Sequence, residues 1–251
     1  KHNSRSIKLL FKKTFFLNLA LAALCASISL ILSSQGLLKR AELASLDFCF
    51  RLRGPAPANT RINIIEITDS DITKVGRWPW PRQWHAAITE ALTAFGAKAI
   101  YFDIIFAENS DEKDDAIFEE AIKKSKNVYL PFVFHNNIID KSNLLLPIKK
   151  FYPYIKGTGA VNIYPDSDGI LRRIPIAFHD KEGQIYPHAA LSLALDYRGL
   201  KVKELNPRWL LVSGANEEFR IPIADKNTML INWAGKWEYS FNHYDYLGVL
   251  A

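Results

Sequence analysis

The sequence predicts an α/β protein, in which an N-terminal transmembrane helix precedes a mixed α/β domain with a parallel βαβ half and an antiparallel, β-hairpin-rich half. Three observations predict this fold class: an uncharged apolar run over residues 15–32, apolar strands that alternate with helical patterns from 61 to 134, and short strand patterns divided by turn residues after 157. The chain has 251 residues, of which 49% are hydrophobic and 23% charged. This composition excludes a disordered, collagen-like or disulfide-scaffold protein.

The apolar run, FFLNLALAALCASISLIL, carries no charge, and a helix of about 20 residues crosses the ~30 Å core of a bilayer. Five basic residues and no acid lie in residues 1–13, so the positive-inside rule places this tail in the cytoplasm. We therefore expect a basic cytoplasmic tail over 1–13, an uncleaved signal anchor over 14–38, and an extracytoplasmic domain over 39–251. A cleaved secretory signal is the alternative.

The net charge of +6 lies almost wholly in the tail, because the chain beyond residue 13 holds 27 basic and 26 acidic residues. A nearly neutral domain lacks the basic surface that nucleic-acid binding needs, so no nucleic-acid partner is expected. Cys25 lies within the apolar run and Cys49 beyond it, which argues against a disulfide between them. Neither cysteine has metal-ligating neighbours, and we expect no metal and no cofactor.

The first half of the domain reads as alternating helices and strands. A helix over 39–53, with Leu43, Leu46 and Phe50 at helical spacing, stops at Gly54. The elements expected after it are a buried strand at 61–69, a helix from Pro81 to Phe95 that ends at Gly96, a strand at 99–106, an acidic helix at 111–125 that buries Ile117 and Ile122, and a strand at 128–134 shortened by Pro131. Apolar strands joined by helices are typical of parallel βαβ units.

The second half changes character. Residues 160–178 (AVNIY, the turn PDSDG, and ILRRIPIAF) predict an antiparallel hairpin. A helix from Pro187 to about Tyr197 and strands at 209–212, 219–223 and 229–233 are expected next, and 136–157 reads as irregular. The chain has no initiating Met and ends without a terminal signal, so we expect it to be a piece of a longer protein.

Asp69 and Asp103 follow, or nearly follow, the first two predicted strands. Ligands of open parallel sheets bind beyond the carboxyl ends of the strands. If these two strands are neighbours, the carboxylates face one crevice and can hold a cation or receive a basic ligand group. The structural alternative, which we favour, is that each Asp caps a helix or fixes a loop.

Residues 78–82, WPWPR, form the most specific segment of the chain. Trp78, Trp80 and Arg82 together can cradle a ligand by stacking and cation–π contact. The segment can equally cover the core, with Arg82 paired to a loop carboxylate, and we favour this packing because aromatic side chains more often fill cores than bind ligands.

Arg172 shares the period-two face of Ile170, Ile174 and Ile176 in the predicted strand. An inward Arg needs a carboxylate, and Asp69, Asp103 or Asp168 can serve; a local bulge that turns it outward is equally supported. The acids at 108–115 match no calcium loop and are best explained as a solvated helix N-terminus. Motifs of phosphate-binding loops, metal-binding His pairs and acyl-transfer enzymes are absent from the sequence.

The signal anchor and five later segments resemble the CHASE2 domain, the extracytoplasmic sensory module of bacterial transmembrane receptors. The segments are LDFCFRLRGP, IIEITDSDITKVGRWPWPRQWHAAITEAL, GAKAIYFDIIF, YPDSDGILRRIPI and IYPHAALSLAL. The resemblance implies that further membrane spans and a cytoplasmic output domain follow: a class III nucleotide cyclase, a histidine kinase or a Ser/Thr kinase. The positions that match are Asp69, Trp78, Pro79, Trp80, Arg82, Asp103, Asp168, Gly169 and Arg172.

We therefore expect a sensory ectodomain that is not itself an enzyme and that regulates a cytoplasmic output, an adenylate or guanylate cyclase first and a kinase second. Its expected partners are the bilayer, a small ligand or an envelope protein, and a second copy of the chain in a homodimer. Tentative ligand-binding residues are Asp69, Trp78, Trp80, Arg82, Asp103 and Arg172. Two alternatives stay open: a periplasmic metal-dependent enzyme that uses Asp69 and Asp103, and an envelope interaction module that senses nothing.

Overall fold

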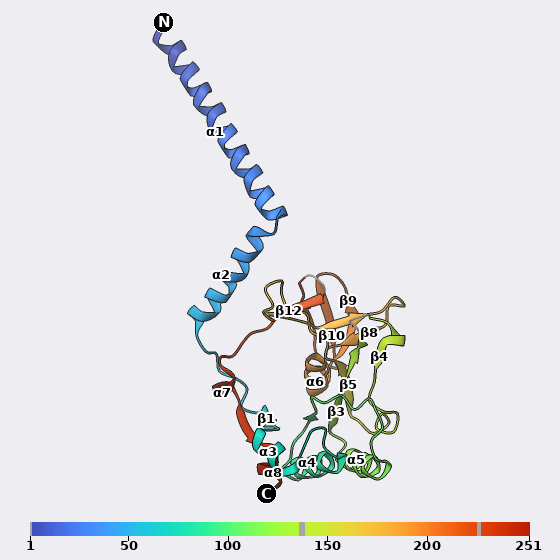
Figure 1. The fold of residues 1–251 in the computed structure, drawn as a ribbon. Helices are drawn as coiled ribbons and strands as arrows, with labels where there is room; N and C mark the ends of the chain where they lie inside the picture. Colours follow the sequence, from blue (N-terminus) through green and yellow to red (C-terminus); the bar gives the residue numbers. More distant parts are fainter. Residues whose placement is uncertain (1, 136–138, 225–226) are drawn as a thin grey trace. The chain divides into compact units, whose positions relative to one another are not determined.

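A computed structural model describes residues 2–135, 139–224 and 227–251. It divides into two compact units, residues 1–56 and 57–251 (Figure 1). The predicted fold class is confirmed, because an apolar N-terminal helix precedes a mixed α/β body that holds both parallel and antiparallel strand pairs.

The first unit consists of α1 (His2–Ser34) and α2 (Leu37–Arg53). Within α1, the 21 residues Thr14–Ser34 are long and apolar enough to cross a membrane, and none of them is buried against protein. Gly36, with φ of 71°, separates the two helices in a left-handed conformation that only glycine adopts without cost. The helix predicted over 39–53 is thus confirmed as α2, and its C-terminal Gly54 donates to the carbonyls of Phe50 and Arg51.

The second unit contains a parallel sheet centred on β3 (Val128–Phe134), which pairs with β2 (Ile100–Tyr101) and β5 (Gly157–Ala160). A short antiparallel strand, β4 (Leu144–Leu145), follows the 3₁₀ turn η2 (Lys141–Asn143) and also pairs with β3. Residues 136–138 of the stretch predicted to be irregular lie outside the described residues. Helices α4 (Arg82–Ala94) and α5 (Glu112–Ser125) lie side by side in Figure 1 and pack against each other.

The strand predicted at 128–134 is confirmed as β3, and Pro131 lies within it without interrupting the pairing. The carbonyl of Tyr129 accepts the Phe102 N–H at 3.2 Å, so this edge of β3 faces β2. Two residues later Pro131 faces the same edge, but β2 has already ended at Tyr101. The missing N–H of Pro131 therefore leaves no partner unpaired, which is the condition for proline within a strand.

The strand predicted at 61–69 is present as β1 (Asn63–Glu66), but its neighbour differs from the prediction. It pairs in parallel with β13 (Asn242–Asp245) and not with β2. An apolar run indicates that a strand is buried without naming its partner, and here the partner comes from the far end of the chain. The predicted strand at 99–106 is also reduced to β2, because the chain beyond Tyr101 turns so that Phe102 and Phe106 enter the core.

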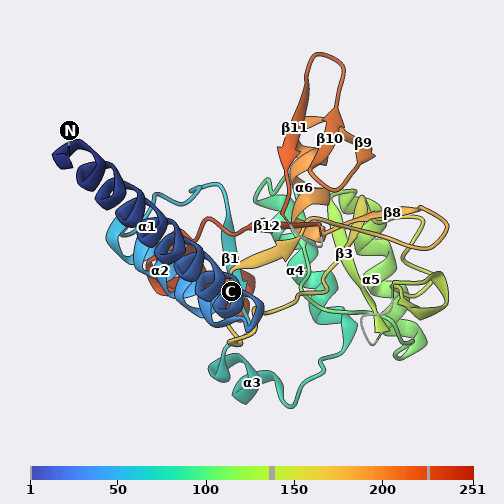
Figure 2. The ribbon, with the colours of Figure 1, turned by 90° about the horizontal axis from the view of Figure 1, so that it is seen from above.

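Among the described residues, the antiparallel half contains three separate strand groups. Strands β9 (Lys201–Leu205), β10 (Trp209–Ser213) and β11 (Glu218–Pro222) form one sheet beside α6 (Ala189–Arg198) in Figure 2. The remaining pairs are β6 (Arg173–Pro175) with β12 (Thr228–Leu230), and β7 (Ala177–His179) with β8 (Ile185–Pro187). The strands predicted at 209–212, 219–223 and 229–233 and the helix predicted at 187–197 are therefore confirmed within a few residues.

The predicted hairpin over 160–178 is wrong. Its turn exists, since Gly169 N–H donates to the Asp166 carbonyl and Asp166 N–H to the Ile170 carbonyl. The flanking segments, however, pair elsewhere: β5 with β3, and β6 with β12. Gly159 in β5 fits so closely against α6 that a Cβ there would lie 2.4 Å from the Ala189 Cα.

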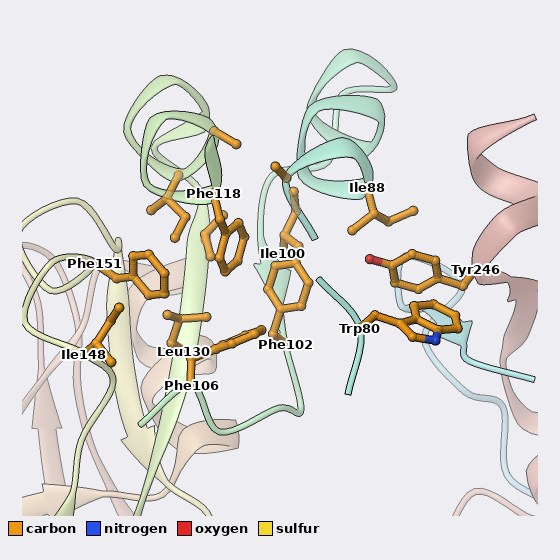
Figure 3. Packing of buried hydrophobic residues seen from close by; sticks show 14 residues of the cluster. Trp80, Ile88, Ile100, Phe102, Phe106, Phe118, Leu130, Ile148, Phe151 and Tyr246 are labelled. Atoms are coloured by element: carbon orange, nitrogen blue, oxygen red, sulfur yellow. The ribbon is translucent and has the colours of Figure 1, made fainter. Parts of the chain in front are cut away.

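The main core lies between α4, α5 and the β2–β3 edge (Figure 3). Phe118 of α5 is at its centre, with its ring centroid 5.1 Å from that of Phe151 and 5.2 Å from that of Phe106. Each such aromatic pair adds about 0.5–1.5 kcal/mol to the gain from burial. The buried face of α5 runs through Asp115, Phe118 and Ile122, so Ile122 is buried as predicted but Ile117 is exposed.

The remaining helices are short and lie in the part of the chain that follows β1 or surrounds β13. They are α3 (Asp69–Val75), α7 (Trp237–Ser240) and α8 (Tyr246–Leu250). Helix α8 contacts α4, so the end of β13 leads directly onto the main core.

Candidate functional site

The WPWPR segment supplies both a core residue and a surface residue. The Trp80 side chain is 4% exposed and its indole N–H donates to the Gly76 carbonyl at 2.9 Å, whereas Trp78 is 37% exposed. The two rings lie 5.7 Å apart, centroid to centroid. Trp80 therefore packs as the structural interpretation predicts, and Trp78 is the indole of this segment that reaches solvent.

Arg82, the last residue of that segment, is buried between α4 and α5. Its guanidinium forms an ion pair with Asp115 and donates to the Glu108 carbonyl. It also lies over the rings of Phe106 and Phe151, at 5.4 Å and 5.2 Å from their centroids. The predicted carboxylate partner thus exists, but it belongs to a helix, and the expectation that Asp115 is solvated is wrong.

His85 is a central residue of the core that the sequence reasoning missed. Its side chain is 1% exposed and its ring packs edge-on against Phe106 and Trp78. Its Nδ1 lies 3.0 Å from the hydroxyl oxygen of Tyr246, the first residue of α8. Burial, with a smaller contribution from Arg82, lowers the pKa of His85 to about 4. The available signal was the spacing of His85 three residues before Ile88 and seven before Leu92 on one helix face.

Tyr246 connects the C-terminal segment to this core. Its ring lies 5.3 Å from that of Trp80, centroid to centroid, and the two side chains are neighbours in Figure 3. Burial raises the pKa of the Tyr246 hydroxyl well above its usual value, so this group stays protonated and can donate to His85. The neutral imidazole and the phenol form a hydrogen bond in an apolar core. Removing one partner leaves the polar group of the other unsatisfied, which costs about 1–3 kcal/mol.

Asp71 makes a second connection to the same segment. It forms a capping box with Thr68 at the start of α3, and its Oδ1 accepts the Leu247 N–H of α8 at 3.3 Å. Burial alone would raise the pKa of Asp71, but the hydrogen bonds from Thr68, Leu247 and Tyr246 outweigh it and hold this pKa below its usual value. Asp71, and not Asp69 two residues earlier, is therefore the acid that organises this loop.

Asp69 and Asp103 are both exposed, and they follow strands of different sheets. The premise that their strands are neighbours is therefore wrong. Within residues 2–135, 139–224 and 227–251, no group of three or more His, Cys, Asp or Glu side chains is arranged to hold a metal ion.

Arg172 points inward, as one of the two sequence interpretations held. Its side chain is 3% exposed and bonds Asp168 at 2.8 Å and Asp166 at 3.1 Å. The hydrogen bond from Arg172 lowers the pKa of Asp168 to about 2. Arg173 also reaches Asp166, at 2.9 Å, so two guanidinium groups fix the turn before β6.

An open pocket of about 390 Å³ lies at the amino-terminal ends of the parallel strands. Its central polar group is Asp196, which accepts from the Tyr129 hydroxyl and pairs with Lys156 Nζ at 2.9 Å. The lining is completed by Lys98, Ala99, Leu193 and Tyr197. The six residues predicted to bind a ligand lie outside this lining, so the structure does not gather them at this pocket.

A family model described as the CHASE2 domain matches residues 20–251. No curated protein and no solved structure matches the chain.

Proposed function

We propose, from the premise that this chain belongs to the CHASE2 family of extracytoplasmic, non-catalytic sensor domains, that it senses a small ligand or an envelope partner and passes the change to a cytoplasmic output domain. The output that the family resemblance favours is an adenylate or guanylate cyclase, with a protein kinase second. The apolar helix α1 fits a membrane protein, and we place it in the bacterial inner membrane.

One observation carries this proposal: the segment that enters the domain and the segment that ends it are joined. β1, which follows α2 and a nine-residue connection, pairs in parallel with β13 through Asn63–Asn242 to Glu66–Asp245. Beyond β13, Tyr246 bonds His85 and Leu247 bonds Asp71. In the proposed receptor, a change in the packing of the core therefore alters the segment that leads to later membrane spans. A ligand shifts the equilibrium between two states of the domain only by the difference between its affinities for them.

The metal-enzyme alternative loses its premise, because β1 and β2, the strands that precede Asp69 and Asp103, belong to different sheets. The non-sensing interaction module loses one of its two surface indoles, because Trp80 is buried, and keeps the other, because Trp78 is 37% exposed.

The test uses the full-length receptor in membranes and measures its cytoplasmic output as cyclic nucleotide formed or phosphate transferred. Tyr246→Phe removes the hydroxyl that bonds His85 and keeps the ring, and the matched control is Tyr239→Phe at an 84% exposed side chain. We expect the first variant to change basal output several-fold and the control to leave it unchanged. A folded Tyr246→Phe variant with wild-type output, with and without stimulation, would contradict coupling through this segment.

A further inference from the structure

The open pocket at the amino-terminal ends of the parallel strands is large enough for a small molecule. Its volume is about 390 Å³, and ligand sites in proteins measure about 300–1,000 Å³. Lys98, Tyr129 and Lys156 lie at or just before the starts of β2, β3 and β5, and Asp196 and Tyr197 lie in the last turns of α6. The pocket is thus supported by regular elements, which hold side chains in place better than loops do.

The ring of Tyr129 is fixed in the pocket by its neighbours. Gly157 pairs with Tyr129 across β5 and β3, and a Cβ on this glycine would lie 2.8 Å from the Tyr129 Cε1, so its missing side chain makes room for the ring. The Tyr129 hydroxyl donates to the Asp196 carboxylate, and Lys156 Nζ lies 5.7 Å from the ring centroid. An aromatic wall that is already in place costs a ligand little to organise.

The lining of the pocket carries more positive than negative charge. Asp196 pairs with Lys156 at 2.9 Å and so balances one of the two lysines. The ammonium of Lys98, the other lysine, forms no hydrogen bond or ion pair with any residue that the structure describes. An ammonium group has three N–H donors, so a negatively charged oxygen group can accept from both lysines while Asp196 keeps its partner.

We propose that this pocket is the ligand site of the sensor and that it binds a small organic anion. Lys98 and Lys156 hold its carboxylate or phosphate group, and its flat apolar body packs on the rings of Tyr129 and Tyr197. The organic body follows from the size and the aromatic lining, because an inorganic ion fills only a small part of this volume. The inference rests on the proposed function, since it names the class of ligand that the sensor detects.

The same pocket is connected to the strand that enters the domain. The Tyr197 hydroxyl accepts a hydrogen bond from Arg61 Nη1 at 2.7 Å. Arg61 lies two residues before β1, which pairs with β13. A ligand that moves the Tyr197 side chain therefore also acts on the start of β1, one of the two strands through which the proposed coupling passes.

The test measures binding of four probes by saturation-transfer difference NMR, with the 251-residue chain in nanodiscs and empty nanodiscs as the blank. The probes are benzoate, phenyl phosphate, the neutral benzyl alcohol and the cationic benzylamine. We expect one or both anions to bind with a Kd of about 1–10 mM, which is typical of a molecule of about ten atoms. The neutral and cationic probes, which gain nothing from the two ammonium groups, should bind at least about tenfold more weakly.

Lys98→Met removes the unpaired charge and keeps the apolar part of the side chain. It should weaken binding of the anions about tenfold or more, as the loss of one charge-assisted hydrogen bond implies. Because the Lys98 ammonium has no partner in the fold, this variant should keep the wild-type urea midpoint, which separates loss of binding from loss of folding. Lys113→Met, at an exposed lysine on α5, is the matched control and should bind the anions as the wild type does.

Equal affinity of Lys98→Met and Lys113→Met for the anions would overturn the proposed site. So would binding of benzylamine as tight as that of both anions, or the absence of binding by either anion. The readout does not involve the output domain, so this failure is distinguishable from failure of the proposed function. Anion binding that depends on Lys98, together with a receptor output that ignores Tyr246→Phe, would support the site and reject the coupling.

Discussion

Replacing His85 should remove most of the acid sensitivity of the folded domain. The folded state holds this imidazole neutral, because burial lowers its pKa to about 4, against an ordinary value of about 6.5. Between these two values the unfolded chain binds a proton that the folded chain excludes, so stability falls as the pH drops from about 6.5 to about 4 and is unaffected by this group above pH 7. At 1.36 kcal/mol for each pKa unit, the loss is about 3 kcal/mol.

The assay is urea unfolding followed by tryptophan fluorescence, with the 251-residue chain in nanodiscs at several pH values from 7.5 to 4.5. All six tryptophans lie beyond residue 77, so the signal reports the second unit and not α1 or α2. The double variant His85→Phe/Tyr246→Phe keeps two rings in place and removes both the titrating group and the hydroxyl that would lose its partner. The matched control is Tyr246→Phe alone, which keeps the titration.

We expect the wild type and Tyr246→Phe to lose stability steeply below pH 6.5, and the double variant to lose much less. His188, whose pKa burial also lowers, contributes a smaller slope of the same sign that remains in every variant. A double variant with the same slope as the wild type over this range would refute the assignment of the acid sensitivity to His85.

Two further predictions concern packing. Arg82→Ala leaves a buried carboxylate on α5 unpaired and should lower the free energy of unfolding by about 3–5 kcal/mol. The control Arg77→Ala, at an exposed position, should change it by less than about 0.5 kcal/mol. Urea unfolding measures both variants, and equal effects would contradict the buried ion pair. Gly159→Ala forces a Cβ to within 2.4 Å of the Ala189 Cα and should cost at least about 1–3 kcal/mol. Gly248→Ala in α8, where the nearest atom is 3.5 Å away, should be neutral or stabilising by up to about 1 kcal/mol, and thermal unfolding distinguishes the pair.

The sequence indicated most elements but not the pairing of the strands. Two strands were identifiable, the Ile-rich one at 61–69 and the one at 128–134, because continuous apolar runs are typical of buried strands. The neighbour of β1 was not identifiable, because its partner β13 lies 179 residues away in register and its sequence, NHYD, has no apolar pattern. Non-local pairing is set by tertiary packing, which local periodicity does not report.

The candidate site shows the same division. The inward position of Arg172 was one of two interpretations that period-two alternation supported equally, and Asp168, its partner in the structure, was one of three carboxylates that the cost of burying an unpaired charge suggested. The roles of His85 and Asp71 did not follow, since each depends on the C-terminal residues that α8 brings to it. Sequence reasoning weighted Asp69 because it ends a strand, whereas the capping geometry selects the acid two residues later.

The central claim, an anchored domain that faces away from the cytoplasm, is tested most directly by alkaline phosphatase fused after residue 251 and expressed in a bacterium. Alkaline phosphatase folds to its active form only outside the cytoplasm. We expect an active fusion that stays in the membrane fraction after a carbonate wash, and an inactive one when the enzyme is fused after residue 13. An inactive fusion at 251 would contradict the anchored sensor. So would an active fusion that the wash releases because residues 14–34 have been cleaved from it.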